Sequence, residues 1–206
     1  DTLTHHWREV LIAAGLKVVE TAPFYIFSTF VVSYATSTLS YQKSQVLEAV
    51  TVGALIATVT IPLMGLLSDK IGRKRMYAIS VALLGLFIVP WFLLLNTGTT
   101  WGIMLATIVM FGVLWAPVTA VLGTLCSEIF SANVRYTGIT LGYQIGAALA
   151  GGTAPLIATG LLAKYDGDWV PVAWYLLTTV AISLVAIFFA SRVKRSPALN
   201  AQPNEL

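Results

Sequence analysis

Long apolar stretches alternate with short charged segments along the chain. Five stretches contain no Asp, Glu, Lys or Arg, and they cover residues 21–42, 49–68, 76–127, 136–163 and 169–191. A helix needs about 20 apolar residues to cross the hydrocarbon core of a bilayer. Each stretch is therefore long enough to cross a membrane.

The stretch 76–127 is too long for one crossing, because a single helix of that length would extend about 78 Å at about 1.5 Å per residue. The polar, turn-forming segment 96–100 divides it into two. The pattern therefore predicts a linker at 1–9, a tail at 193–206, and between them six membrane-spanning helices. These helices are expected at about 10–36, 47–68, 76–95, 101–126, 137–163 and 171–192.

The composition supports an integral membrane protein. Of the 206 residues, 57% are hydrophobic and only 10% are charged, whereas a soluble domain has about 25% charged residues. The mean hydropathy is +0.83, which also excludes charge-rich disorder. Cys126 is the single cysteine, so neither an intramolecular disulfide nor a thiolate metal cluster can form, and we expect no metal or cofactor.

Basic residues predict the orientation, because they are enriched in cytoplasmic loops. The other side of the membrane receives only Lys43 and Lys164, outside the spans. The expected cytoplasmic side, which includes both termini, receives Arg8, Lys70, Arg73, Lys74, Arg75, Arg135, Arg192, Lys194 and Arg195. This distribution explains the basic residues as topology signals and argues against a nucleic-acid partner.

The loop between the second and third predicted helices contains residues that favour a sharp turn at the membrane surface. Asp69 lies where the apolar helix ends, and Gly72 permits a sharp turn. Arg73 and Lys74 follow, where they can anchor at lipid headgroups and pair with Asp69. Taken alone, these residues indicate a helical hairpin with cytoplasmic anchors.

The same loop resembles the cytoplasmic signature of the major facilitator superfamily, G-x-x-x-D-[RK]-x-G-R-[RK]. The matching residues are Gly65, Asp69, Lys70, Gly72, Arg73 and Lys74. The resemblance implies an all-α fold: a six-helix membrane bundle that forms half of a twelve-helix carrier, built from two inverted three-helix repeats. It also implies that the loop is a gate latch, in which Asp69 pairs with Arg73 and faces the opposite half.

A second cytoplasmic segment lies between the fourth and fifth predicted helices. Glu128 and Arg135 could pair there and bridge two helix ends, or form an ordinary surface pair worth under about 1 kcal/mol. The pattern E-x-F-[PS]-x-x-V-R-x-x-G, followed by L-G-Y-Q-x-G, resembles the metabolite:proton symporter branch of the superfamily. That branch includes alpha-ketoglutarate, shikimate, citrate and proline/betaine transporters.

This resemblance implies a secondary active transporter in the cell membrane, with proton-coupled symport of a small organic acid or zwitterion by alternating access. The chain would be the C-terminal half, and the N-terminal half of the same transporter would be its partner. A sugar or drug transporter of the same superfamily, and a membrane sensor that binds without transport, remain alternatives. We expect no enzyme, because H-E-x-x-H and G-x-S-x-G motifs are absent.

The first predicted helix carries two ionisable residues inside the membrane, Lys17 and Glu20. They are three residues apart and so share a helix face. Thr21, Phe24 and Ser28 lie near the same line. Ionisable groups at that depth cost several kcal/mol unless they are paired or hydrated. The stripe either lines the transport path, with Lys17 attracting an anion and Glu20 accepting a proton, or forms a structural pair between halves.

The fifth predicted helix has a small-residue face and a polar face. Gly138, Gly142, Gly146 and Ala150 recur every four residues, which favours close helix packing. Tyr143 and Gln144 on the other face could orient a polar substrate or form hydrogen bonds between helices. Trp115, deep in the fourth helix, could line a cavity or pack in the core.

Overall fold

The computed structural model of the chain describes residues 6–131 and 134–190. The predicted tail at 193–206 and the first five residues of the predicted linker therefore lie outside the described part. Within the described ranges all the regular elements are helices, and six helical spans are long and apolar enough to cross a membrane. The predicted fold class, an all-α membrane bundle of six helices, is confirmed.

Three spans are single α-helices, and three contain a π-helical segment. The single helices are α4 (Lys43–Ile71), α5 (Arg73–Leu95) and α10 (Val170–Ala190). The composite spans are α2 (Trp7–Tyr25) with η1 (Ile26–Phe30) and α3 (Val31–Ser37), α6 (Thr100–Thr107) with η2 (Ile108–Trp115) and α7 (Ala116–Ile129), and α8 (Arg135–Gly146) with η3 (Ala147–Gly151) and α9 (Ala154–Lys164).

Local sequence explains where the helices end. Gly72 has a φ of 97° and separates α4 from α5 by one residue, a conformation that glycine adopts without steric cost. Thr99 caps α6, because its hydroxyl accepts the backbone N–H of Gly102 at 3.0 Å. Charged and capping residues lie between the spans. Helix α4 therefore begins at Lys43, four residues before the start of the predicted membrane-spanning helix at 47.

The π-helical segments lie near prolines. Pro23 lies inside α2, three residues before η1, whereas Pro117 and Pro155 lie in the first turns of α7 and α9, after η2 and η3. Proline has no backbone N–H, so it removes a helical hydrogen bond. Sharp changes in helix direction occur at prolines and at π-helical segments.

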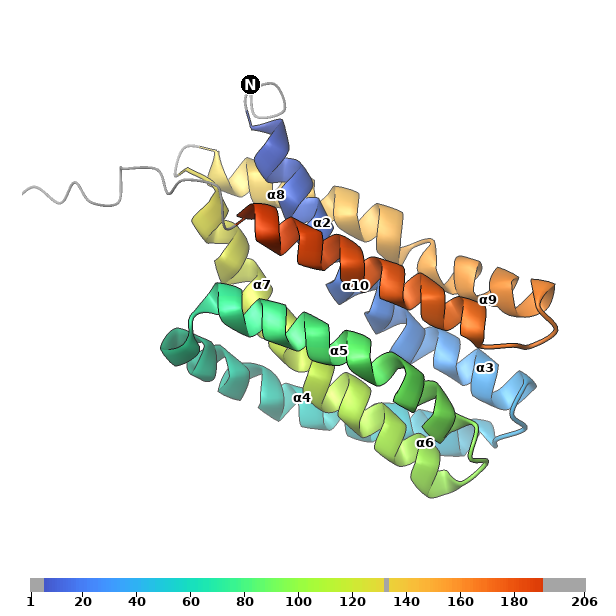
Figure 1. The fold of residues 1–206 in the computed structure, drawn as a ribbon. Coiled ribbons are helices and arrows are strands. Elements are labelled where there is room, and N and C mark those ends of the chain that lie inside the picture. The colour runs from blue at the N-terminus through green and yellow to red at the C-terminus, as the bar shows by residue number, and fades with distance from the viewer. Residues whose placement is uncertain (1–5, 132–133, 191–206) are drawn as a thin grey trace, which may run out of the picture.

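The first and fourth spans form the centre of the bundle. Helix α2 packs against α8 and α10, α4 packs against η2 and α7, and α5 packs against α7 and α10 (Figure 1). In the most apolar window, 56% of the residues of the first span and 61% of the fourth are buried, against 11% for α4. Helix α4 is therefore peripheral and presents most of its surface outward.

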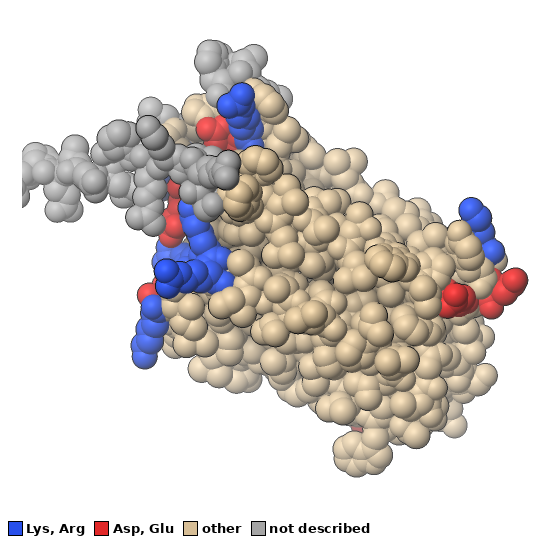
Figure 2. Space-filling view, in the orientation of Figure 1, with Lys and Arg blue, Asp and Glu red and all other residues tan. Residues whose placement is uncertain are grey.

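Charged side chains gather at one end of the bundle. The beginning of α2, the α4–α5 turn and the end of α10 lie at the same end (Figure 1). Figure 2 shows Lys and Arg concentrated there, a smaller charged group at the opposite end, and an uncharged surface between them. This distribution and the six apolar spans show a multi-pass membrane protein.

Hydrogen bonds tie the spans together at the less charged end. The Tyr41 hydroxyl donates to the carbonyls of Leu95 at 3.0 Å and Thr99 at 3.2 Å, and the Asn96 amide donates to the Tyr34 hydroxyl at 3.0 Å. Burial raises the pKa of Tyr41 further above its ordinary value, which already keeps the hydroxyl protonated at neutral pH. The connections of the first and third spans are thus fixed relative to each other.

Candidate functional site

An ion pair lies part-buried in the middle of the first span. The ammonium of Lys17 contacts the Oε2 atom of Glu20 one turn away on α2, and their side chains are 18% and 13% exposed. Glu20 lies thirteen residues from the start of the helix at Trp7, which places it about 20 Å along the axis at about 1.5 Å per residue. The pair therefore lies well inside the apolar part of the bundle.

Glu20 is held by two further hydrogen bonds. The hydroxyl of the buried Thr21 donates to its Oε2 atom at 2.9 Å. The indole N–H of Trp115, at the end of η2, donates to the backbone carbonyl of Glu20 at 2.7 Å. The carboxylate thus has Lys17 and Thr21 as partners, and the fourth span fixes the backbone beneath it.

Aromatic rings border the pair on two sides. Phe24 and Phe111 lie against Trp115, with ring centroids 5.2 and 5.3 Å away. On the other side, the Lys17 ammonium lies 4.9 Å from the centroid of the Tyr143 ring on α8, a cation–π contact. The Tyr143 hydroxyl is buried, and its neighbour is the thiol of the buried Cys126 on α7, a weak hydrogen-bond partner. The site therefore combines two charges, aromatic faces and one weakly paired hydroxyl.

The glycines of α8 explain why α2 and α8 lie so close. A Cβ atom added to Gly142 would lie 2.6 Å from the Cβ of Ala13, and one added to Gly146 would lie 2.8 Å from the Cβ of Lys17. Real Cβ atoms essentially never come this close. The small-residue face of α8 therefore packs on α2 beside Lys17, as small-xxx-small spacing allows.

The structure brings most of the predicted path residues together. Six of them share this cluster: Lys17, Glu20, Thr21, Phe24, Trp115 and Tyr143. Ser28 instead donates to the carbonyl of Phe24 in its own helix at 2.6 Å, and Gln144 is exposed on α8. Phe111 was not predicted as a site residue, because a phenylalanine within a long apolar run carries no signal of its own.

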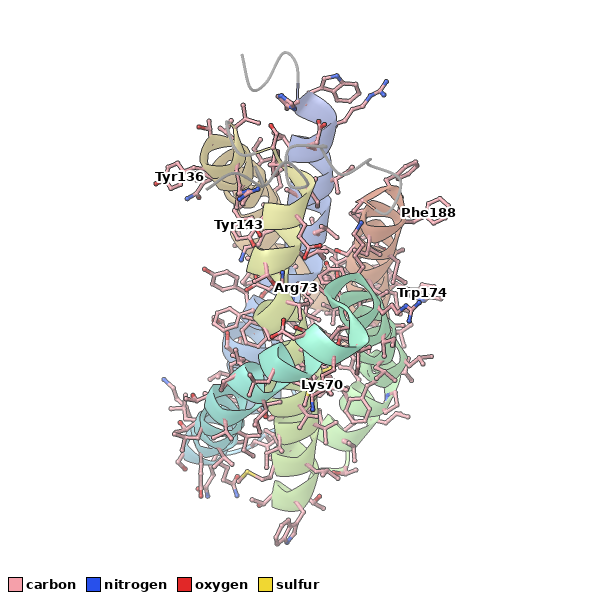
Figure 3. All side chains as sticks on the ribbon, turned by 90° about the vertical axis from the view of Figure 1, so that its left-hand side faces the viewer. Lys70, Arg73, Tyr136, Tyr143, Trp174 and Phe188 are labelled. Carbon is pink, nitrogen blue, oxygen red and sulfur yellow. The ribbon has the colours of Figure 1, made fainter. Side chains whose placement is uncertain are left out.

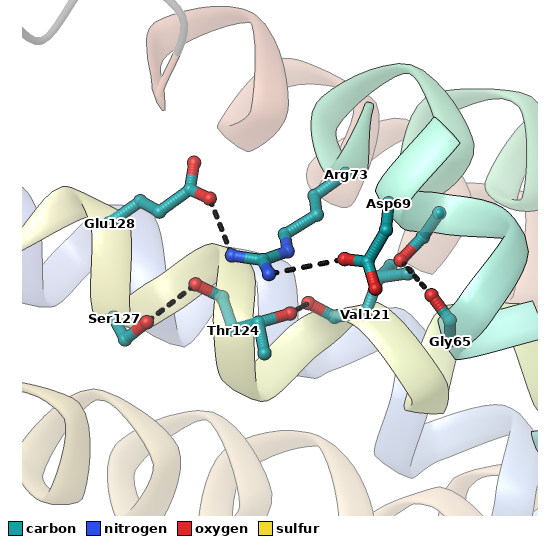
Figure 4. A network of polar contacts seen from close by, with 8 residues as sticks. Gly65, Asp69, Arg73, Val121, Thr124, Ser127 and Glu128 are labelled. Carbon is teal, nitrogen blue, oxygen red and sulfur yellow. Dashed lines mark hydrogen bonds and ion pairs between the residues drawn. The ribbon is translucent and has the colours of Figure 1, made fainter. Parts of the chain in front are cut away.

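A second polar cluster lies at the charged end of the bundle (Figure 4). Arg73, the first residue of α5, contacts Asp69 near the end of α4 at 3.2 Å and Glu128 near the end of α7 at 2.9 Å. Their side chains are between 27% and 59% exposed. One guanidinium thus joins the ends of three helices, and the predicted pairing of Asp69 with Arg73 is confirmed.

The other predicted gate residues surround this cluster. Lys74 donates to the carbonyl of Ala190, the last residue of α10, at 3.1 Å, and Gly65 accepts the hydroxyl of Ser68 at 2.6 Å. Arg135 begins α8, and its buried Nε atom has no hydrogen-bond partner among the described residues. The Arg73–Glu128 contact was not predicted, and a pair between Glu128 and Arg135 stays a prediction.

Seen from the charged end, several large aromatic side chains lie on the outer surface, away from the candidate gate residues. Arg73 lies near the centre of Figure 3, whereas Tyr136, Trp174 and Phe188 point outward. These three side chains are 85%, 67% and 53% exposed, as expected for residues that contact lipid or its headgroups. Among the described residues, no group of three His, Cys, Asp or Glu side chains could hold a metal ion.

Comparisons with known proteins agree with this architecture. The family model described as Major Facilitator Superfamily matches residues 15–205. The ectoine/proline transporter ProP of Corynebacterium glutamicum is 32% identical over 98% of this chain. The glycine betaine/proline/ectoine/pipecolic acid transporter OusA of Dickeya dadantii is 28% identical over 98%, and the shikimate transporter of Escherichia coli is 27% identical over 95%.

The chain spans 40% of the length of the first two relatives and 45% of the third. All three are named as transporters, which confirms the expectation that the chain is not an enzyme. Their names also agree with the metabolite-transporter branch indicated by residues 127–146. The family model covers most of the chain, from within the first apolar span to beyond the sixth; this chain therefore belongs to the Major Facilitator Superfamily.

Proposed function

We propose that the chain is one six-helix half, the C-terminal one, of a secondary transporter that moves a small organic acid or zwitterion by proton-coupled symport. The observation that carries the proposal is the part-buried Lys17–Glu20 pair inside the first span. Ionisable residues within a membrane are expensive, and they typically mark substrate or ion paths. This pair is also bordered by a polar hydroxyl and aromatic rings.

The chemistry of the pair suits a carboxylate substrate. The Lys17 ammonium can exchange the Glu20 carboxylate for the carboxylate of a ligand. Lys17 and the ligand then form a new ion pair, in which each charge compensates the other. Glu20, released from Lys17, would then take a proton or the cationic group of a zwitterion. Phe24, Phe111 and Trp115 would contact the apolar part of the ligand or its cationic group.

The names of the relatives support the same substrate class. Proline, glycine betaine and ectoine each carry one carboxylate and one positive charge, and shikimate carries a carboxylate. A carboxylate is common to all of them and fits Lys17. The positive charge of the zwitterions fits the aromatic faces next to Glu20.

The cluster of Asp69, Arg73 and Glu128 supports a gate at the charged end, which we place at the cytoplasm. Ion pairs that are this exposed contribute little to stability, but they can be exchanged for contacts with an opposing surface. Helix α4 carries the apolar side chains Leu55, Val59, Leu63 and Leu66, which are 54–66% exposed. This face would contact the N-terminal half, lipid, or both in turn.

The direct test is uptake by the full-length transporter in proteoliposomes. Radiolabelled proline, glycine betaine, shikimate, a dicarboxylate and a sugar are compared with and without an inward proton gradient. We expect gradient-dependent uptake of a carboxylate-containing solute and none of the sugar. Sugar uptake would favour the sugar-transporter alternative, and substrate binding without flux would favour a sensor.

The roles of the pair are tested in the same vesicles. Glu20→Gln should abolish the dependence of uptake on the proton gradient, and Lys17→Met should raise the substrate KM by at least about tenfold, the value of one charged contact. Glu48→Gln is the matched control, because Glu48 is exposed near the beginning of α4. Normal pH-dependent uptake by the Glu20→Gln protein would remove Glu20 from proton coupling.

A further inference from the structure

The turn of α2 that carries Lys17 is bonded to a serine from the sixth span. The Ser183 hydroxyl of α10 donates to the carbonyl of Gly15 at 2.6 Å, and the same oxygen accepts the backbone N–H of Val19 at 3.2 Å. Gly15 and Val19 are four residues apart, so they are the two partners of one helical hydrogen bond. One buried side chain from another helix therefore satisfies both ends of that bond.

The packing around Ser183 is tight enough to fix this contact. Ser183 is fully buried, and a Cβ atom added to Gly15 would lie 2.9 Å from the Cβ of Ala186 on α10. Glycine at this position lets α10 approach the backbone of α2 to hydrogen-bonding distance. The contact thus depends on a glycine and a serine that face each other within two apolar helices.

The same turn receives two more donors from other spans. The hydroxyl of the fully buried Tyr77 on α5 donates to the carbonyl of Leu16 at 2.6 Å, and Trp115 donates to the carbonyl of Glu20. Pro23 lacks the N–H that the carbonyl of Val19 would otherwise accept. The backbone at 15–20 therefore relies on side chains of α10, α5 and η2 as well as on its own ladder.

We propose that Ser183 is a positioning residue for the Lys17–Glu20 pair. Its hydroxyl holds the turn at 15–19, and that turn sets where the two side chains lie between Tyr143 and the aromatic cluster. A side chain that enters the hydrogen-bond ladder of a helix bends or holds that helix at the point of entry. The role in substrate binding rests on the proposed function, whereas the hold on the backbone does not.

The hold on the backbone is tested by amide hydrogen exchange of the full-length protein. Ser183→Ala removes the hydroxyl, so exchange in the peptide that covers 15–22 should become about three- to tenfold faster, as expected when one hydrogen bond is lost. Ser80→Ala is the matched control, because the buried Ser80 donates only within α5, to the carbonyl of Met76. Unchanged exchange in Ser183→Ala, or equal acceleration in both variants, would overturn the proposal.

Uptake measurements with the same variants test positioning. Ser183→Ala should raise the substrate KM roughly tenfold while Vmax changes much less, because a displaced binding group loses affinity. Tyr77→Phe keeps the ring, removes the bond to Leu16 and should raise KM less; it decides the question if Ser183→Ala does not fold. A KM equal to the wild-type value in both variants would contradict the positioning role.

Absence of uptake by the wild-type protein would count against the proposed function alone. The exchange result would still decide whether Ser183 holds the turn.

Discussion

Lys17 and Glu20 compensate each other's charge, so removing one should harm the fold more than removing both. Each single neutral variant, Lys17→Met or Glu20→Gln, leaves a part-buried charge without its partner, and we expect a loss of about 3 kcal/mol. The double variant should regain most of that loss. Thermal unfolding of the full-length protein in detergent gives the three values, and additive losses would show that the two charges do not interact.

The Tyr143 hydroxyl is buried, and among the described residues it has only the weak partner Cys126. Tyr143→Phe removes it but keeps the ring that faces Lys17. We expect the free energy of unfolding to rise by up to about 1 kcal/mol, because a thiol only weakly offsets the cost of burying the hydroxyl, while substrate affinity falls. Melting curves and uptake KM are measured together. Lower stability with an unchanged KM would mean that the hydroxyl serves the fold.

Single residues could be predicted where physics leaves few choices. Two opposite charges three residues apart in an apolar helix share a face and can pair, so Lys17 and Glu20 were found without coordinates. Phe111 and Ser183 could not be found in this way. The first is one apolar residue among many, and a lone serine in a membrane helix usually bonds its own backbone, as Ser28 does here. Only the packing of α10 on α2 shows what Ser183 contacts.

The contact between α8 and α2 should be intolerant of added atoms. A Cβ at position 142 would lie 2.6 Å from Ala13 and 3.1 Å from a backbone carbonyl, so Gly142→Ala must push the helices apart. We expect it to lower the unfolding free energy by about 1–3 kcal/mol. Gly160→Ala on α9 is the control, because its added Cβ meets no atom within 4 Å and alanine favours a helix. Equal melting temperatures for both variants would contradict the packing.

The cluster at the charged end should affect the conformational equilibrium more than stability. Its three side chains are 27–59% exposed, so Arg73→Gln should cost under about 1 kcal/mol in unfolding free energy. The same change should favour states in which the charged ends of the two halves are apart, because Arg73 joins three helix ends.

Spin-label distances between the two halves of the full-length transporter report this equilibrium. Lys70→Gln, a change of equal charge in the same turn, should leave the distances unchanged. High salt should move the wild-type distances toward those of Arg73→Gln, since about 1 M salt shortens the Debye length to about 3 Å. Distances that stay the same in Arg73→Gln would exclude the gate role.

Helices were easier to predict than their internal geometry. Apolar length places six spans, and the small residues of 138–150 predict a close helix contact, which the structure places against α2. The π-helical segments and the partner of each helix do not follow from periodicity, because these spans are apolar almost all round. Which helices meet depends on side-chain fit across the bundle, as for α10 on α2 and α4 on η2.

At the scale of the whole molecule, the proposed function makes this six-helix bundle one of two bodies of a carrier. The Lys17 and Glu20 side chains are part-buried, at 18% and 13% exposed, and keep some access from outside the bundle. In alternating access, two bodies rock about a site that lies between them. The sequence indicates a second half only through the resemblance of its loops, since length and hydropathy alone fit a six-helix protein equally well.

If the chain is one of two bodies of a carrier, two separate polypeptides should together restore transport. The 206-residue chain alone, purified and reconstituted, should take up no substrate, because half of the path is missing. Co-expression with the remaining part of the full-length transporter as a separate polypeptide should restore uptake. Uptake should fall again if Leu55→Asp places a charge on the exposed apolar face of α4, whereas the exposed Thr51→Asp near the beginning of that helix serves as control. Substrate flux through the isolated chain would show that six helices suffice and would rule out the half-transporter model.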